Sequence, residues 1–245
     1  MLTLYSMRRS GNCYKVRLAL AQLKIPFQLT EINILQGESR TPEFLAKNPS
    51  GHVPLLEVTP GRYLAEIDIL KGESRTPDFL AKNPSGHVPL LEVTPGRYIA
   101  ESGAILWYIA GGTPLAPEDR IDRAEALQWM FFEQHSVEPN LGAAHFWLTM
   151  VKGGRELQTH ALEGWMENGY QALGVMEKHL ASNDFFAAGR YTIADIALYA
   201  YTHTANESTF DLTGFPSIRA WLKRVADQPG HVPINWQPAA MEIVE

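Results

Sequence analysis

A segment of 35 residues occurs twice in tandem, and it constrains the fold of this 245-residue chain more than any other feature. The first copy spans 32–66 and the second 67–101. Solenoid proteins need three or more repeats to bury a continuous core, so two near-identical copies indicate a duplication inside an existing fold. Removing one copy leaves 210 residues, the size predicted for the ancestral protein. The copies differ at four positions: Asn33/Asp68, Gln36/Lys71, Glu43/Asp78 and Leu64/Ile99.

Composition places the chain among soluble globular proteins, with 45% apolar and 20% charged residues. The net charge of −6 argues against general binding to nucleic acids or anionic membranes, because no basic surplus exists to neutralise phosphates. A single cysteine, Cys13, excludes an internal disulfide and suits a reducing compartment. The first twelve residues have no apolar core of signal-peptide length, and no run of eighteen apolar residues follows. A cytoplasmic location is therefore predicted.

The first hundred residues alternate between strand and helix patterns. Strands are predicted at 2–5 and 27–35, and an amphipathic helix lies between them at 13–23. In each repeat, Thr-Pro begins a short helix and Asn-Pro ends it. Two strands around a Thr-Pro-Gly turn follow. A helix at 102–110 completes a β-α-β-α-β-β-α order in which the β-α-β-β section is duplicated.

From Pro117 onward the pattern is helical throughout. Long helical stretches are predicted at 120–151, with an interruption near Pro139, and at 155–181. Thr192 can cap another helix, with Asp195 in the position of a capping-box acid. The last amphipathic helix is predicted at 216–227. The sequence thus indicates an α/β domain at residues 1–111 and an all-α domain at residues 117–245, joined by a Gly/Pro-rich linker.

Three motifs give the chain a resemblance to the cytosolic glutathione transferases, above all to bacterial, theta-, zeta- and nu-like members. The first is Leu4-Tyr5-Ser6 followed by Ser10 to Arg17. The second is Asn-Pro-Ser-Gly-His-Val-Pro-Leu-Leu with Glu101-Ser102-Gly103-Ala104-Ile105, and the third is the capping box at Thr192. The resemblance implies a thioredoxin-like N-terminal domain, which contains the repeat 32–66/67–101, followed by a helical C-terminal domain.

The resemblance also implies glutathione as co-substrate and places its site. A cis Val88-Pro89 peptide would pair with the extended tripeptide as one more strand edge. Glu101 and Ser102, at the start of a helix, would hold the ammonium and carboxylate of the γ-glutamyl end. His87 stands where relatives carry a residue that contacts glutathione. The alternatives are an ordinary trans proline, a plain helix cap at Ser102 and a surface histidine.

The residues predicted to act in catalysis are Ser10 and Asn12. Relatives place a hydroxyl at Ser10 that hydrogen-bonds the glutathione sulfur and lowers the pKa of its thiol, helped by the positive end of the first helix. The alternative is an N-cap without a further role, although both roles can coexist. Asn12 matches an amide in a bacterial class associated with disulfide reduction. Cys13 falls inside the first helical turn, where burial is expected rather than nucleophilic action.

The function implied by the resemblance is transfer of the glutathione thiolate to an electrophilic, apolar small molecule, and the chain is expected to be a homodimer. The alternatives are a glutathione-dependent disulfide reductase and a non-catalytic binding or scaffold protein whose site the duplication disrupts. No metal site is expected. Aromatic side chains at helical spacing could line the pocket of the second substrate. They are Phe131, Phe132, Phe146 and Trp147, together with His135.

The two copies compete for the same place in the fold. Glu66 is followed by Ile67-Asp68, whereas Glu101 runs directly into Ser102 and its helix. This difference favours a site built by the second copy, with Pro89 rather than Pro54 beside glutathione. The first copy would then be displaced, as an excursion at the edge of the sheet or as an element exchanged in a dimer.

Overall fold

The computed structural model describes residues 2–6, 9–31, 55–59, 62–65, 81, 90–94 and 97–236. The chain divides into two compact units. Unit 1 comprises Met1–Ile105 together with Val232–Glu245, and unit 2 comprises Leu106–His231. Unit 1 is therefore discontinuous in sequence, and the return of the chain after residue 231 is not indicated by any sequence pattern.

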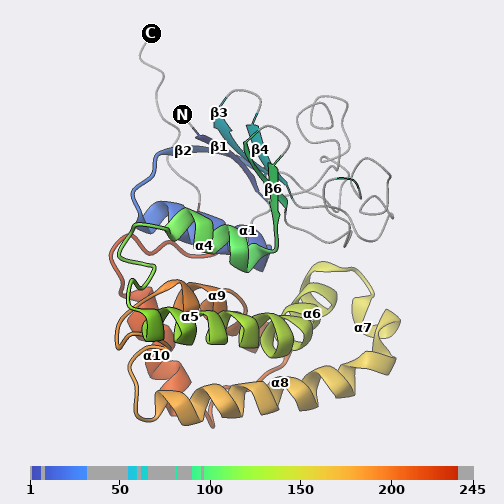
Figure 1. Ribbon diagram of the computed structural model, residues 1–245. Helices are drawn as coiled ribbons and strands as arrows, with labels where there is room; N and C mark the ends of the chain where they lie inside the picture. Colours follow the sequence, from blue (N-terminus) through green and yellow to red (C-terminus); the bar gives the residue numbers. More distant parts are fainter. Residues whose placement is uncertain are drawn as a thin grey trace. The chain divides into compact units, whose positions relative to one another are not determined.

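Unit 1 contains a six-stranded sheet in the order β2-β1-β3-β4-β5-β6 (Figure 1). β1 and β2 are parallel, as required when a helical crossover joins them, and all other neighbours are antiparallel. The strands are β1 (Leu2–Ser6), β2 (Phe27–Glu31), β3 (Leu55–Thr59), β4 (Arg62–Ala65), β5 (Leu90–Thr94) and β6 (Arg97–Ala100).

Both repeats contribute a hairpin to this sheet. β3 and β4 come from the first copy and β5 and β6 from the second, with the same register irregularity in each hairpin. The first copy lies beside β1 through Leu4↔Leu56, and the second joins the outer side of the first through Leu64↔Leu91. The prediction that the first copy is displaced is wrong for these strands, because the first copy, not the second, pairs with β1. The first copy follows β2 directly, so it closes the shorter loop onto β1, while its β3 sequence equals that of β5.

Helix α1 (Gly11–Gln22) is the crossover between β1 and β2. All its residues from Cys13 to Leu20 are buried, including the cationic Lys15 and Arg17. Residues 232–236, here called the C-terminal strap, are bound to it by side-chain hydrogen bonds. The Tyr14 hydroxyl donates to the Val232 carbonyl over 2.8 Å, and the Arg17 guanidinium donates to the Ile234 carbonyl over 2.5 Å.

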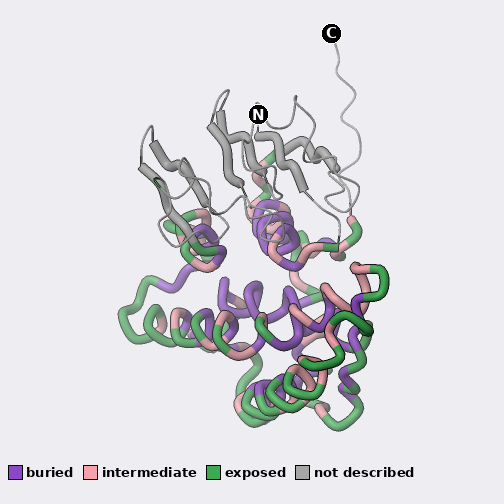
Figure 2. The backbone as a smooth tube through the Cα atoms, turned by 90° about the vertical axis from the view of Figure 1, so that its right-hand side faces the viewer, coloured by how far each residue is buried: buried purple, intermediate pink, exposed green. Residues whose placement is uncertain are grey.

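Unit 2 is helical, and exposed segments lie around a buried centre (Figure 2). Pro139 does not break the first long stretch, which continues through it as a π-helix. The Asn140 side chain donates to the Ser136 carbonyl over 2.8 Å, in the turn where proline has no N–H to give. The elements are α4 (Ser102–Ala110, begun in unit 1), α5 (Arg120–Phe132), η5 (Glu133–Gly142), α6 (Ala143–His145), η6 (Phe146–Met150), α7 (Gly154–Leu157), α8 (Thr159–Leu180), α9 (Ile193–Thr202), η7 (Ala205–Ser208) and α10 (Pro216–Ala226).

The predicted capping box at the start of α9 is confirmed. The Thr192 hydroxyl accepts from the Ala194 N–H, and the Asp195 carboxylate accepts from the Thr192 N–H over 2.9 Å. The same fully buried carboxylate also accepts from Trp221 Nε1 over 2.9 Å and from the Phe186 N–H over 3.2 Å. Burial raises the pKa of Asp195 to about 6, against the opposing effect of these donors.

Helix α8 packs closely against the segment after η7 at one glycine. A side chain at Gly169 of α8 would collide with the ring of Phe210, whereas Gly174 on the same helix faces open space. The carboxylate of Glu177 in α8 caps α10. It accepts from the Ser217 and Ile218 N–H groups at the start of that helix, each over 2.9 Å. No helix among the described residues is long and apolar enough to cross a membrane.

Candidate functional site

Ser10 occupies the N-cap of α1, directly after the turn that follows β1. Its hydroxyl oxygen accepts from the Cys13 N–H over 3.3 Å, and its carbonyl accepts from the Tyr14 N–H over 2.9 Å. The backbone at Ser10 is extended, as a capping residue requires. Because the oxygen accepts in the cap, the hydroxyl hydrogen is left to donate to a ligand. The hydroxyl is also placed at the positive end of the helix.

The next residues of α1 differ in their access to solvent. Asn12 is half-buried in the first turn, next to the capping serine. Cys13 is fully buried, so the expectation that it is a core residue is confirmed. The guanidinium of Arg17 binds the C-terminal strap. Ser10 and Asn12 remain the residues predicted to act at this turn.

The second part of the candidate site lies where β6 meets α4. Glu101 is exposed and has a φ of +75°, in the left-handed region that non-glycine residues rarely adopt. Its carbonyl accepts from the Ile105 N–H over 3.0 Å, so Glu101 holds the capping position and Ser102 is the first helical residue. The alternative in which Ser102 is a plain N-cap thus does not describe this turn. Ser102 itself is buried.

A lysine that the sequence did not single out reaches this turn from α1. The side chain of Lys15 is 2% exposed, and its Nζ lies 3.5 Å from the Ser102 hydroxyl oxygen. The contact links α1 to the start of α4 within unit 1. Lysine side chains are rarely fully buried in proteins. The signal in the sequence is a cation inside an otherwise apolar run, Cys-Tyr-Lys-Val, in a helix without a polar face.

The remaining predicted glutathione contacts, His87, Val88 and Pro89, lie outside the described residues, as does Pro54 of the first copy. Their assignment stays a prediction.

The aromatic residues considered for a second substrate do not gather at one place. Phe132 and His135 line a groove of about 480 Å³ between η5 and α8, together with Asn168 and Val175. Phe131 is 70% exposed. Phe146 and Trp147 pack against each other edge to face, with ring centroids 5.5 Å apart. Phe132 and His135 are therefore the two that share a groove.

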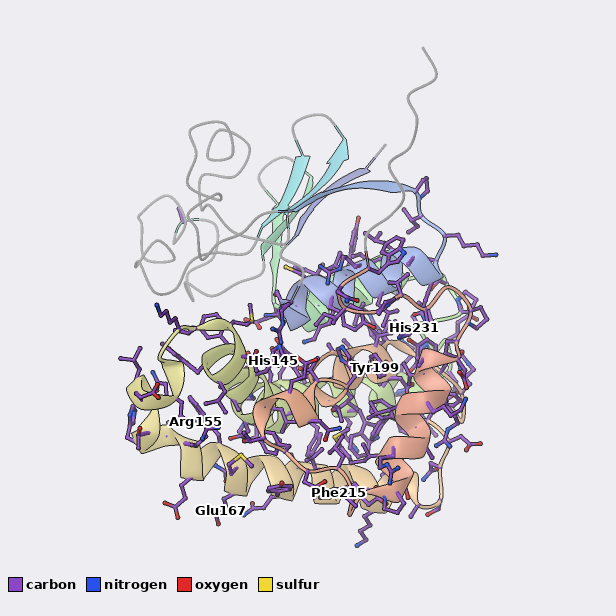
Figure 3. All side chains as sticks on the ribbon, turned by 180° about the vertical axis from the view of Figure 1, so that it is seen from behind. His145, Arg155, Glu167, Tyr199, Phe215 and His231 are labelled. Carbon is purple, nitrogen blue, oxygen red and sulfur yellow. The ribbon has the colours of Figure 1, made fainter. Side chains whose placement is uncertain are left out.

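Unit 2 also holds a group of histidines around Tyr199, labelled in part in Figure 3. The rings of Tyr199 and His203 stack with centroids 4.7 Å apart, and His203 Nδ1 lies 2.7 Å from the Tyr199 carbonyl oxygen. Burial, together with the nearby His145 and His231, lowers the pKa of His203 to about 4, against the raising effect of its hydrogen bond to the Tyr199 carbonyl. Within the described ranges, no three His, Cys, Asp or Glu side chains are arranged to hold a metal ion.

A glutathione S-transferase N-terminal domain model matches residues 4–68, and a second such model matches 65–111. A glutathione S-transferase C-terminal domain model matches residues 159–224. The two N-terminal matches follow one another along the chain, one over each copy of the repeat.

Solved structures and curated proteins give the same result. A possible glutathione S-transferase from Rhodopseudomonas palustris is 57% identical, with a TM-score of 0.76 over 97% of this chain and 99% of that one. A glutathione transferase family member from Pseudomonas fluorescens, solved with two glutathione molecules bound, is 25% identical, with a TM-score of 0.66 over 94% and 89% of the two chains. A disulfide-bond oxidoreductase from Escherichia coli is 27% identical over 94% of this chain and 92% of its own. Together with the fold, these matches establish that the chain belongs to the glutathione S-transferase family.

Proposed function

We propose that this chain transfers the thiolate of glutathione to an electrophilic, apolar small molecule. The observation that carries the proposal is the Ser10 hydroxyl at the N-terminus of α1, with its oxygen engaged in the cap. A hydrogen bond from Ser10 to the glutathione sulfur, added to the helix dipole, would favour the thiolate over the thiol. The bound glutathione of the Pseudomonas fluorescens relative supports glutathione as co-substrate.

Five residues would hold the co-substrate. Ser102 would donate to the γ-glutamyl carboxylate, and the exposed Glu101 carboxylate would attract the neighbouring ammonium. Val88 and Pro89 would pair with the cysteinyl segment, and His87 would stand beside it. Catalysis would then combine proximity with stabilisation of the thiolate, without a covalent enzyme intermediate. A homodimer in the cytoplasm remains part of the proposal.

A second candidate is glutathione-dependent disulfide reduction. Asn12 in the first turn of α1 and the similarity to the Escherichia coli disulfide-bond oxidoreductase favour it. In that reaction two glutathione thiols are oxidised to one disulfide, while the substrate disulfide is reduced to two thiols. Parallel assays with chlorodinitrobenzene and with hydroxyethyl disulfide separate the two candidates, because only the first substrate reports conjugation.

The test uses substitutions that separate capping from chemistry at Ser10. Ser10→Gly costs a helix cap only a few tenths of a kcal/mol, so the variant should fold normally, yet kcat/KM for conjugation should fall about 100-fold. Ser10→Thr keeps a hydroxyl and should retain most activity. The pH at which the ultraviolet absorbance of the bound thiolate appears should be higher in Ser10→Gly than in the wild type. Retention of glutathione without turnover by the wild type would point to a non-catalytic binding protein.

A further inference from the structure

The two hairpins of the sheet in unit 1 have almost the same sequence. Strands β3 and β5 both read Leu-Leu-Glu-Val-Thr, whereas β4 reads Arg-Tyr-Leu-Ala and β6 reads Arg-Tyr-Ile-Ala. The single difference is Leu64 against Ile99. The hairpins also share their internal register, including a shift between the glutamate and the last threonine of β3 and of β5. Either hairpin therefore offers β1 the same strand.

Each strand pair of the sheet has a counterpart when the hairpins exchange places. In the observed order β2-β1-β3-β4-β5-β6, β1 pairs with β3 through Leu4↔Leu56, and β4 pairs with β5. In the order β2-β1-β5-β6-β3-β4, β5 would meet β1 through Leu4↔Leu91, and β6 would meet β3 through Ile99↔Leu56. Because both orders use the same strand sequences in the same registers, their ladders contribute nearly equally to stability.

The connections between the strands are long enough for both orders. Residues 32–54 join β2 to β3, and residues 66–89 join β4 to β5, so these connections have 23 and 24 residues. An extended chain spans about 3.3 Å per residue, whereas neighbouring strands lie only about 4.8 Å apart. Placing either hairpin two positions further from β1 therefore does not stretch the chain.

Two features separate the orders. The exchange of Leu64 with Ile99 conserves side-chain volume, and such an exchange changes an equilibrium by about 10-fold at most. The other feature is the start of α4, which directly follows β6, because the Ser102 hydroxyl oxygen lies 3.5 Å from Lys15 Nζ in the observed order. This distance is at the long limit of a hydrogen bond, so the contact is a weak restraint. The observed order is favoured, but only by a small margin.

We propose that the two hairpins exchange places, so that the folded chain adopts both sheet orders. Opening within unit 1 is sufficient for the exchange, because unit 2 is contiguous and compact by itself. The end of β6 lies four places from β1 in the observed order and would lie two places away after exchange. The exchange therefore changes the spacing between Glu101, which follows β6, and the turn of Ser10, which follows β1. It requires neither glutathione nor catalysis.

Disulfide trapping in the folded full chain measures both orders. Thr3 pairs with Glu57 in the observed order and would pair with Glu92 in the exchanged one. Residues opposite each other in antiparallel strands have Cα atoms about 4.5–5.5 Å apart, which a disulfide can bridge. The test variants are Thr3→Cys/Glu57→Cys and Thr3→Cys/Glu92→Cys. Each is purified in the reduced form, oxidised with copper phenanthroline under native conditions and analysed by peptide mass spectrometry.

Both variants should form a disulfide within one chain. Thr3→Cys/Glu57→Cys should react first, and Thr3→Cys/Glu92→Cys should react about 10-fold more slowly, because it must wait for the less populated order. The yield of the slower variant should still approach completion. Each disulfide that forms withdraws a molecule from the exchanged order, and the equilibrium then supplies another.

Two controls measure disulfides that form by chance collision. Thr3→Cys/Leu91→Cys places the second thiol one residue out of register, on the opposite face of β5, and should give less than about a tenth of the product. Thr3→Cys alone measures any bond to the native Cys13, which is fully buried.

A second pair on β1 repeats the comparison if a Thr3 variant does not fold. Tyr5 pairs with Leu55 and would pair with Leu90 after exchange, so both double-cysteine variants are made at these positions. Exchange is refuted if the second-copy variants react no more than the out-of-register control while the first-copy variants react. It is also refuted if their yield stops at a constant fraction, as two orders fixed during folding would give, or if their disulfides join two chains. All three results leave the proposed function intact.

Discussion

His203 and Asp195 should make opposite contributions to stability as the pH changes. For His203 the folded pKa of about 4 lies below the ordinary value of 6.5. The unfolded chain therefore takes up the proton first, and the stability present above pH 6.5 is lost as the pH falls toward 4. For Asp195 the folded pKa of about 6 lies above the ordinary 3.8, so stability is present below pH 3.8 and is lost as the pH rises through 6.

The two effects are similar in size. Each pKa unit is worth about 1.4 kcal/mol, so either residue contributes about 3 kcal/mol across its window. Because the windows overlap and the signs differ, the two contributions nearly cancel in the wild type. Removing one of the groups should expose the other. The difference in unfolding free energy between wild type and His203→Gln should therefore shrink by about 3 kcal/mol from pH 7 to pH 4, whereas the difference for Asp195→Asn should grow by about the same amount.

Urea unfolding followed by circular dichroism at pH 4, 5, 6 and 7 measures these differences. Comparing each variant with the wild type at every pH cancels the titration of all other groups. His160→Gln, on the exposed surface of α8, controls for the loss of one histidine. Differences that stay constant with pH for both variants, or that change in the same direction, would refute the reasoning.

Three further predictions concern packing and caps. Gly169→Ala should destabilise the protein by about 1–3 kcal/mol in thermal unfolding, because its new methyl group meets an aromatic ring. Gly174→Ala, at an open position of the same helix, should stabilise the protein by up to about 1 kcal/mol. Equal effects of the two substitutions would contradict this packing. Glu177→Gln should cost about 1 kcal/mol, measured as a lower urea midpoint, because a charged helix cap becomes neutral. Trp221→Phe should cost about 1–2 kcal/mol in wild type and much less in Asp195→Ala, since the alanine has already removed the acceptor of the same hydrogen bond. Additive losses in that double-mutant cycle would show that the bond is absent.

Local patterns predicted the elements whose causes are local. The capping box at Thr192 and the helix that begins at Pro216 depend on neighbours within a few residues, so the sequence shows them directly. Burial of Cys13 followed from its place in the first turn of a helix. The continuous helix through Pro139 was not predicted, because proline usually ends a helix and here lies inside a wider π-helical turn.

Long-range placement could not be predicted in the same way. The β3 and β5 sequences are identical, so no side-chain pattern could decide which of them pairs with β1. The contact of Lys15 with Ser102 could not be predicted from local patterns, because Ser102 lies 87 positions further along the chain. The sequence identified the serine at this turn from its motif, whereas its contact with the lysine of α1 is seen only in the structure.

The C-terminal strap makes the order of synthesis matter for this protein. Translation delivers Ser10 and α1 early, but Val232 and Ile234, which accept hydrogen bonds from that helix, emerge only after all of unit 2. Unit 2 is contiguous, so it can complete its own fold on the ribosome while unit 1 still lacks these contacts. A gene fragment that stops at residue 111 would produce an α1 without its strap. The turn that bears Ser10 is thus anchored by one of the last parts of the described chain to be made.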